Sequence, residues 1–157
     1  MNLYFFHGKE SGPHGSKYHS LTTLGDVISP DFQGMNIEER LEKAIEITAD
    51  QKDLVVVGSS MGGLLAALLY DRHPERFAAL ILLAPALYGE LAQGIERMPP
   101  ADQFRVLHGG HDEIVPVEAV QNFCDRFDLP LTIVDDKHRL KNSHSEMLEM
   151  VRTFIEL

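Results

Sequence analysis

The stretch Leu54-Val55-Val56-Val57-Gly58-Ser59-Ser60-Met61-Gly62-Gly63-Leu64-Leu65 decides the fold of this chain. An apolar run rich in β-branched residues leads through glycines and serines into a second apolar run with helical composition. A strand, a tight turn and a helix in this order are typical of an α/β unit. Gly58 and Gly62 allow the backbones of strand and helix to approach each other closely at the turn.

Within this stretch, residues 58–62 fit the pattern G-x-S-x-G. The pattern predicts that Ser60 occupies a strained turn, which presents its hydroxyl above the end of the sheet. Free amides at the start of the following helix favour negative charge beside that hydroxyl. Small residues in loops match the pattern often, but here the flanking strand and helix supply the context that it requires. Ser60 is therefore the predicted nucleophile, and the alternative is an ordinary Ser-Gly connection.

The rest of the chain alternates between strand and helix patterns. Six short apolar runs predict strands, at residues 3–6, 27–30, 54–57, 77–84, 104–107 and 131–134. Helical spacing of apolar residues between the runs predicts helices, two of them with capping boxes at Asn36–Glu39 and Ser143–Glu146. This order predicts one α/β domain over residues 1–157, a three-layer αβα sandwich with a mostly parallel sheet of about six strands.

Composition and charge narrow the class of protein. Of the 157 residues, 44% are hydrophobic and 24% charged, as in a globular domain with a sizeable core. The net charge of −10 disfavours nucleic acid or an anionic membrane surface as a partner. The first residues lack a signal peptide and no apolar run could span a bilayer, so we expect a cytoplasmic protein. The single cysteine, Cys124, excludes an internal disulfide and is expected to be buried on a helix.

Residues suited to catalysis follow several of the predicted strands. Ligands of parallel sheets bind beyond the carboxyl ends of the strands, where Gly8, Ser60, Asp112 and His138 all fall. A serine hydroxyl needs a base, and the base needs an acidic partner that holds the correct tautomer. Their order along the chain, serine then aspartate then histidine, is one of the known orders of such a triad.

These segments give the chain a resemblance to the small serine esterases of the α/β-hydrolase superfamily. It is similar to the compact, lidless group whose first strand ends in a His-Gly loop followed by a Ser-Lys pair. The matching segments span essentially the whole chain: residues 6–8, 12–17, 58–62, 108–116 and 136–140.

The resemblance implies a minimal α/β-hydrolase fold without a cap domain. It implies a triad of Ser60, Asp112 and His138, and an oxyanion hole formed by the backbone N–H groups of Lys9 and Met61. The implied reaction is hydrolysis of a carboxylic ester or thioester of a small molecule, with neither cofactor nor metal.

The first loop, which follows the predicted strand at residues 3–6, carries the predicted substrate contacts, Gly8 and Lys17. The side chains of Lys9 and Lys17 either steer an anionic part of the substrate or are only solvated. His7 is expected to shape this loop and not to act as the base. The segment 88–101 is predicted to be a loop or short helix, and it is the only source of a small lid. An open, shallow pocket favours short acyl groups or an ester on a larger molecule; the sequence leaves the substrate and the oligomeric state open.

Other residues offer alternatives for these roles. His144, in the first turn of the last predicted helix, is the main alternative base, although a helix face reaches the site less easily than a loop. Glu113 remains an alternative acid by spacing alone. His108 and His111 flank Asp112, but the chain supplies no second cluster of ligands that would complete a metal site.

Two other functions remain open. A non-catalytic scaffold of the same fold could bind a protein or a small ligand, although it would have no use for an intact triad. A peptidase or a carbon–carbon bond hydrolase usually needs larger substrate-binding insertions, for which this chain has little room.

Overall fold

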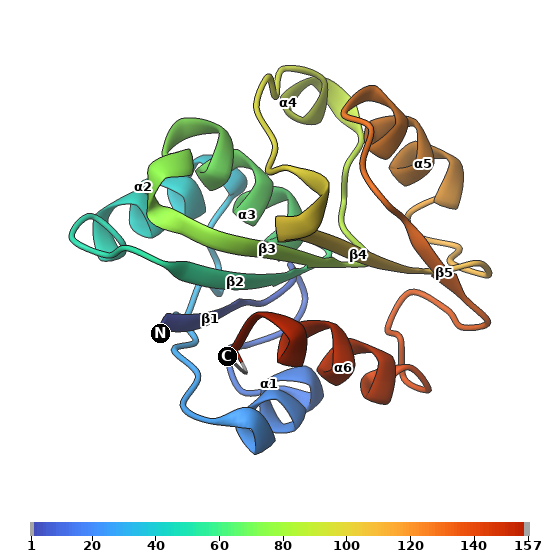
Figure 1. Cartoon of the computed structure of the whole chain (residues 1–157), viewed down its shortest axis with the longest axis horizontal. Coiled ribbons are helices and arrows are strands. Elements are labelled where there is room, and N and C mark those ends of the chain that lie inside the picture. The colour runs from blue at the N-terminus through green and yellow to red at the C-terminus, as the bar shows by residue number, and fades with distance from the viewer. Residues whose placement is uncertain (1, 156–157) are drawn as a thin grey trace.

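A computed structural model describes residues 2–155, in which one five-stranded parallel sheet lies between two layers of helices (Figure 1). The strands, in spatial and chain order, are β1 (Asn2–Phe6), β2 (Leu54–Ser59), β3 (Phe77–Leu83), β4 (Phe104–Gly109) and β5 (Thr132–Val134). The α-helices are α1 (Ser16–Leu21), α2 (Ile37–Ile47), α3 (Met61–Arg72), α4 (Gly89–Gln93), α5 (Val117–Arg126) and α6 (His144–Ile155). The predicted three-layer αβα architecture is confirmed.

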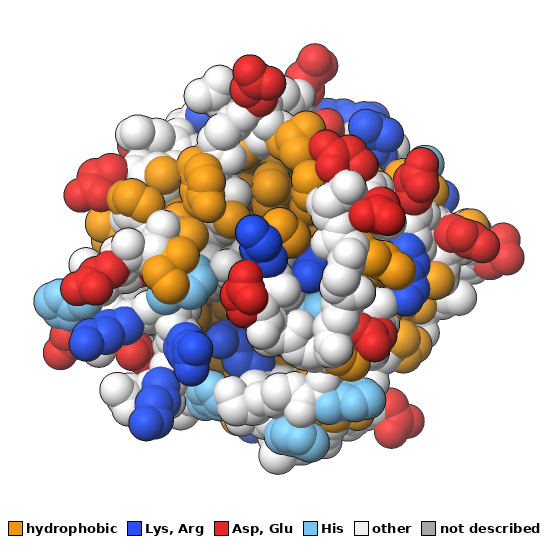
Figure 2. All heavy atoms as spheres, turned by 180° about the vertical axis from the view of Figure 1, so that it is seen from behind, with side chains coloured by type: hydrophobic (Ala, Val, Ile, Leu, Met, Phe, Trp, Pro, Cys, Tyr) orange, Lys and Arg blue, Asp and Glu red, His pale blue; other side chains and the backbone are white. Residues whose placement is uncertain are grey.

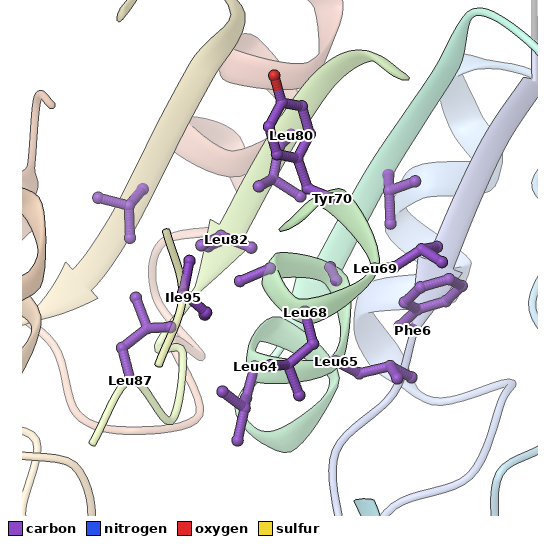
Figure 3. Close-up of a cluster of buried hydrophobic side chains, with 14 of the residues drawn as sticks. Phe6, Leu64, Leu65, Leu68, Leu69, Tyr70, Leu80, Leu82, Leu87 and Ile95 are labelled. Carbon is purple, nitrogen blue, oxygen red and sulfur yellow. The ribbon is translucent and has the colours of Figure 1, made fainter. Parts of the chain in front are cut away.

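Each face of the sheet has its own apolar core. Successive strand side chains point to opposite faces, so Tyr4 and Phe6 pack on one side while Leu3 and Phe5 pack on the other. Helices α2 to α5 cover the first face, and α1 and α6 cover the second (Figure 1). Helix α3 is apolar nearly all round and buries most of its length, as predicted. Figure 3 shows its leucines against the strands: Leu64, Leu65, Leu68 and Leu69 with Phe6, Leu80 and Leu82.

The predicted strand at residues 27–30 is reduced to a single bridge beside β1. Ile28 exchanges two backbone hydrogen bonds, each 2.9 Å long, with Leu3 and Phe5. Pro30 has no N–H to extend this pairing, and proline is confined to the edges of sheets. The described sheet therefore has five strands and one edge bridge where six strands are predicted.

The chain changes direction across the sheet at β1. From β1 it passes through α1 on one face to the Ile28 bridge, and then through α2 on the other face to β2. The Ile28 bridge and β2 therefore flank β1 on opposite sides, and parallel α/β sheets bind their ligands at such a point, beyond the carboxyl ends of the strands. Gly8 and Ser60 follow the carboxyl ends of β1 and β2.

The two predicted capping boxes have different outcomes. Asn36 accepts from the Glu39 N–H at 2.8 Å and the Glu39 carboxylate accepts from the Asn36 N–H at 3.0 Å, so the first box is confirmed. At the start of α6 the Ser143 hydroxyl instead donates to Asp136 at 2.7 Å. The Ser143 N–H donates to the Leu140 carbonyl at 3.0 Å and is not available to Glu146, so tertiary and loop contacts replace the second box.

The segment between β3 and β4 forms the short helix α4, within the predicted loop or short helix. It is attached to the domain from two sides. Arg126 of α5 donates to the carbonyl oxygens of Ala92 at 2.9 Å and Ile95 at 3.2 Å. Asp71 of α3 accepts from the backbone N–H of Arg97 at 2.9 Å.

The single cysteine, Cys124, is buried on α5 as expected. Burial and, to a smaller extent, the nearby Asp125 carboxylate raise the pKa of its thiol to about 12. A thiol so rarely ionised at neutral pH is a poor nucleophile, so Cys124 serves as an apolar core residue.

The surface carries charges of both signs together with exposed apolar side chains. Figure 2 shows one face on which apolar side chains gather around a hollow bordered by basic and acidic ones. The exposed large hydrophobic residues are Ile28, Ile47, Tyr88, Leu91, Ile114 and Ile133. Among the helices described, none combines the length and the apolar character needed to cross a membrane.

Candidate active site

Ser60 lies at the junction of β2 and α3 in a strained conformation. Its φ of 55° and ψ of −115° are rare for a residue with a side chain and cost on the order of 1–3 kcal/mol. Surrounding hydrogen bonds hold it there: its N–H donates to the Leu83 carbonyl at 2.9 Å, and its own carbonyl accepts from the Ala86 N–H at 3.0 Å. Strain of this kind is the expected mark of a serine presented above a sheet.

Two glycines, Gly58 and Gly62, allow the backbone segments around Ser60 to touch, and Gly8 packs against Ser60 itself. A Cβ on Gly62 would overlap the carbonyl oxygen of Phe6, and a Cβ on Gly58 would overlap the carbonyl oxygen of Gly62. A Cβ on Gly8 would lie 3.4 Å from the Cβ of Ser60. The first loop therefore packs directly against the turn that carries Ser60.

The structure brings Ser60, His138 and Asp112 together from three separate loops. His138 Nε2 lies 3.0 Å from Ser60 Oγ, and His138 Nδ1 lies 2.7 Å from Asp112 Oδ2. The Asp112 side chain is fully buried and that of His138 is 16% exposed. Because a carboxylate only accepts, it keeps the proton on Nδ1 and leaves Nε2 free to accept from the serine hydroxyl.

Asp112 is held by its own loop and by a histidine that the sequence did not assign to this role. Its Oδ1 accepts from the N–H groups of Ile114 at 2.8 Å and Val115 at 2.7 Å. The fully buried His108 places Nε2 2.8 Å from the Val115 carbonyl and 3.3 Å from Asp112 Oδ2. His108 therefore supports the carboxylate, where sequence reasoning considered it only as a metal ligand.

The loop that carries His138 is organised by Asp136, which the sequence did not single out. Its carboxylate accepts from the Ser143 hydroxyl at 2.7 Å and from the N–H groups of Lys137 and Asn142, each at 2.8 Å. Burial alone would raise the pKa of Asp136. The hydrogen bonds from Ser143, Lys137 and Asn142, with the charge of Lys17, outweigh that effect and lower the pKa.

We expect Asp136→Asn to lower the free energy of unfolding by about 2 kcal/mol near neutral pH, because an amide would turn one NH₂ toward the donors. Since folding lowers the pKa of Asp136, its contribution is present above the unfolded value of about 3.9. The contribution is lost as the pH falls through the lower folded value. Urea titrations at several pH values should show the difference between wild type and variant shrinking with acidity. A difference that does not depend on pH would contradict this role.

Lys17, a predicted substrate contact, has a protein partner in the structure. Its ammonium donates to the carbonyl of Arg139 at 2.8 Å, which ties α1 to the loop that carries His138. Burial lowers the pKa of Lys17, and the nearby positive charge of Arg139 lowers it by a smaller amount. A contact between Lys17 and the substrate remains a prediction.

The alternative candidates for the base, the acid and the metal ligands are either bonded to other residues or exposed to solvent. His144 Nδ1 lies 2.7 Å from the Ser20 hydroxyl where α6 meets α1, and burial lowers the pKa of His144. Glu113 is exposed, and His111 pairs with the exposed Asp135 at 2.8 Å. Within residues 2–155, no group of three or more histidine, cysteine or acidic residues is arranged to hold a metal ion.

Two backbone amides beside Ser60 are free to donate. Met61 is the first residue of α3, and first-turn amides have no acceptor within their own helix. Lys9 follows Gly8, which packs against Ser60. Neither the Lys9 nor the Met61 N–H has a hydrogen-bond partner in the part of the chain that the structure describes. These are the two donors predicted for the oxyanion hole.

Comparison with known proteins relates the whole chain to one fold. A family model described as the alpha/beta hydrolase fold matches residues 5–152. A solved structure of a protein of the α/β superfamily from Xanthomonas campestris is 25% identical, with a TM-score of 0.81 over 99% of this chain and 98% of that one. Mouse alpha/beta hydrolase domain-containing protein 10 is 21% identical, with a TM-score of 0.79 over 99% and 89%. A serine hydrolase from Cycloclasticus zankles is 15% identical, with a TM-score of 0.71 over 100% and 92%. No curated protein sequence matches the chain.

Proposed function

Because this chain belongs to the α/β-hydrolase fold family, we propose that it is a serine hydrolase that cleaves a carboxylic ester or thioester through an acyl-enzyme intermediate. The observation that carries the proposal is the hydrogen-bonded series that runs from Ser60 Oγ through His138 to Asp112. The described residues form a small domain without a cap, which is consistent with an open site.

In the first half of the reaction, Ser60 Oγ attacks the carbonyl carbon of the substrate while its proton passes to His138 Nε2. Asp112 stabilises the resulting imidazolium through Nδ1. The tetrahedral intermediate then breaks its bond to the leaving oxygen or sulfur, which takes the proton from Nε2. The alcohol or thiol departs, and the acyl group remains on Ser60.

In the second half, His138 Nε2 takes a proton from water as the water oxygen attacks the acyl carbon. Collapse of this intermediate returns the proton to Ser60 Oγ and releases the carboxylic acid. The free N–H groups of Lys9 and Met61 are suited to receive the oxyanion in both halves. Losing one such donor typically costs about 10²–10³-fold in rate.

Apolar side chains on the loops next to Ser60 favour a substrate with an apolar group. Ile114, whose N–H bonds to Asp112, is 66% exposed, and Tyr88, two residues after Ala86, is 54% exposed. The Ala86 N–H bonds to the Ser60 carbonyl, so this segment starts beside the nucleophile. Burying an acyl chain against these side chains would contribute about 0.8 kcal/mol per CH₂.

A fluorophosphonate probe tests whether Ser60 is the nucleophile. The native protein should be labelled at Ser60, which mass spectrometry of the labelled peptide identifies, and prior heat denaturation should prevent labelling. Absence of labelling in the folded protein would favour a non-catalytic scaffold of the same fold.

A matched panel then tests the substrate class. Oxygen esters and thioesters of the same acyl groups, from two to twelve carbons, should be hydrolysed, and kcat/KM should rise with each CH₂ that reaches the apolar side chains and then level off, because an open site holds only a short acyl chain. Cleavage of peptides or carbon–carbon bonds in place of esters would overturn the proposed reaction.

A further inference from the structure

Arg40 of α2 is a buried cation, 1% exposed, without a salt bridge among the described residues. The Asp31 carboxylate attracts it only from beyond ion-pair distance, and the Phe32 ring faces its guanidinium at 5.7 Å. The guanidinium donates only to backbone carbonyls, those of Met35 at 3.3 Å, His7 at 2.9 Å and Gly8 at 3.1 Å. Burying an unpaired charge is unfavourable for stability, so this arrangement calls for a role other than packing.

The carbonyl of Gly8 receives a second donor from His7. His7 Nε2 accepts from the Phe32 N–H at 2.8 Å, so the ring proton is on Nδ1. Nδ1 then donates to the Gly8 carbonyl at 2.8 Å. Burial lowers the pKa of His7, which keeps this neutral tautomer. Two donors from different elements therefore fix the direction of one carbonyl.

The direction of this carbonyl determines where the next amide points. The peptide between Gly8 and Lys9 is trans, and in a trans peptide the C=O and the following N–H point in opposite directions. With the carbonyl held against Arg40 and His7, the Lys9 N–H points away from them. Hydrogen bonds to the carbonyl also polarise the peptide and strengthen its N–H as a donor.

We propose that Arg40 is a positioning residue of the oxyanion hole. It anchors the Gly8 carbonyl so that the Lys9 N–H is directed at the oxyanion formed when Ser60 attacks its substrate. The inference rests on the proposed function, since an oxyanion forms only in that reaction. It adds a buried residue of α2, outside the loops that carry the triad, to the groups on which the rate depends.

Kinetics of Arg40→Met test this role, because methionine fills similar space without donors. We expect kcat for the best ester to fall about 10²-fold with KM nearly unchanged. Affinity for a trifluoromethyl ketone, which forms an oxyanion on Ser60, should fall by the same factor. Arg40→Lys, which keeps the charge and one donor group, should recover part of both losses.

Arg76→Met provides a matched control. Arg76 is a half-buried arginine that donates to the Ile45 carbonyl and the Thr48 hydroxyl, each at 3.0 Å, near the opposite end of α2. This variant should lose stability while keeping the wild-type kcat. Arg40→Met with a kcat within about threefold of wild type would overturn the proposal, as would equal losses of kcat in both variants.

An NMR measurement reports on the amide without turnover. In wild type, phosphonylation of Ser60 should move the amide proton resonances of Lys9 and Met61 downfield. In Arg40→Met only Met61 should respond, and an unchanged Lys9 response would overturn the inference. If Arg40→Met does not fold, Arg40→Lys takes its place, with a reduced Lys9 response expected. A wild-type protein that does not react with the probe would instead reject the proposed function, and this inference with it.

Discussion

The Ser60→Ala variant is expected to hydrolyse a short p-nitrophenyl ester at least about 10⁴ times more slowly than wild type. Alanine lacks the hydroxyl that would form the acyl bond, while the oxyanion donors and the binding surface remain. The loss should therefore appear in kcat, with little change in KM. Initial rates at pH 8 measure it, and circular dichroism with thermal unfolding verifies that the variant is folded.

Ser59→Ala is the matched control for this experiment. Ser59 is the adjacent residue of the same turn and is 9% exposed at the end of β2. Among the described residues it makes no hydrogen bond to His138, so its replacement should leave most of the activity. Full turnover in Ser60→Ala would assign the nucleophile to another residue and would reject the proposed mechanism.

His138→Ala is expected to reduce kcat by a similar factor, about 10⁴-fold or more. Without an acceptor 3.0 Å from Ser60 Oγ, the serine must lose its proton to water as it attacks. The Asp112 carboxylate would also lose its partner at 2.7 Å. Single-turnover measurements of p-nitrophenol release should show that acylation slows, and any acyl-enzyme that forms should also decay more slowly, because the same base activates the water.

His144→Ala discriminates between the two candidate bases. His144 bonds to Ser20 where α1 meets α6, so its removal should lower the melting temperature while kcat stays near the wild-type value. The reverse result, with activity kept in His138→Ala and lost in His144→Ala, would transfer the role of base to His144.

Strand and helix patterns were sufficient to predict the layers of this fold. The continuous apolar run at residues 54–57 and the all-round apolar helix α3 could only be buried, and both are. For residues 27–30 the apolar composition predicts a full strand, because composition alone does not show which backbone N–H groups can pair. Pro30 lacks one, and pairing stops at a single bridge.

The positions of the candidate site residues could also be predicted, because parallel strands end at one edge. Ser60, Asp112 and His138 follow three such strands, and the structure brings them within hydrogen-bonding distance. Their catalytic roles remain predictions that the variants above test.

The groups that support these residues could not be predicted. Arg40 lies 32 positions from Gly8 along the chain, and on an amphipathic helix rich in glutamate and lysine it resembles a solvated residue. His108 lies in the last part of β4, where burial and not spacing reveals its contact with Asp112. Such contacts depend on which side chains the folded chain brings together, and local patterns do not contain that information.

Helix α4 and its flanking residues are attached through Arg126 and Asp71, and residues 88–103 make no described hydrogen bond to the triad or to the first loop. The attachments of this segment are therefore separate from the hydrogen bonds that hold the candidate catalytic residues. The segment begins two residues after Ala86, whose N–H bonds to the Ser60 carbonyl, so a longer or exchanged connection would change the surface beside the nucleophile and leave the hydrogen bonds of the triad in place. It is the position at which such a small domain could acquire new substrates by insertion, in evolution or in the laboratory.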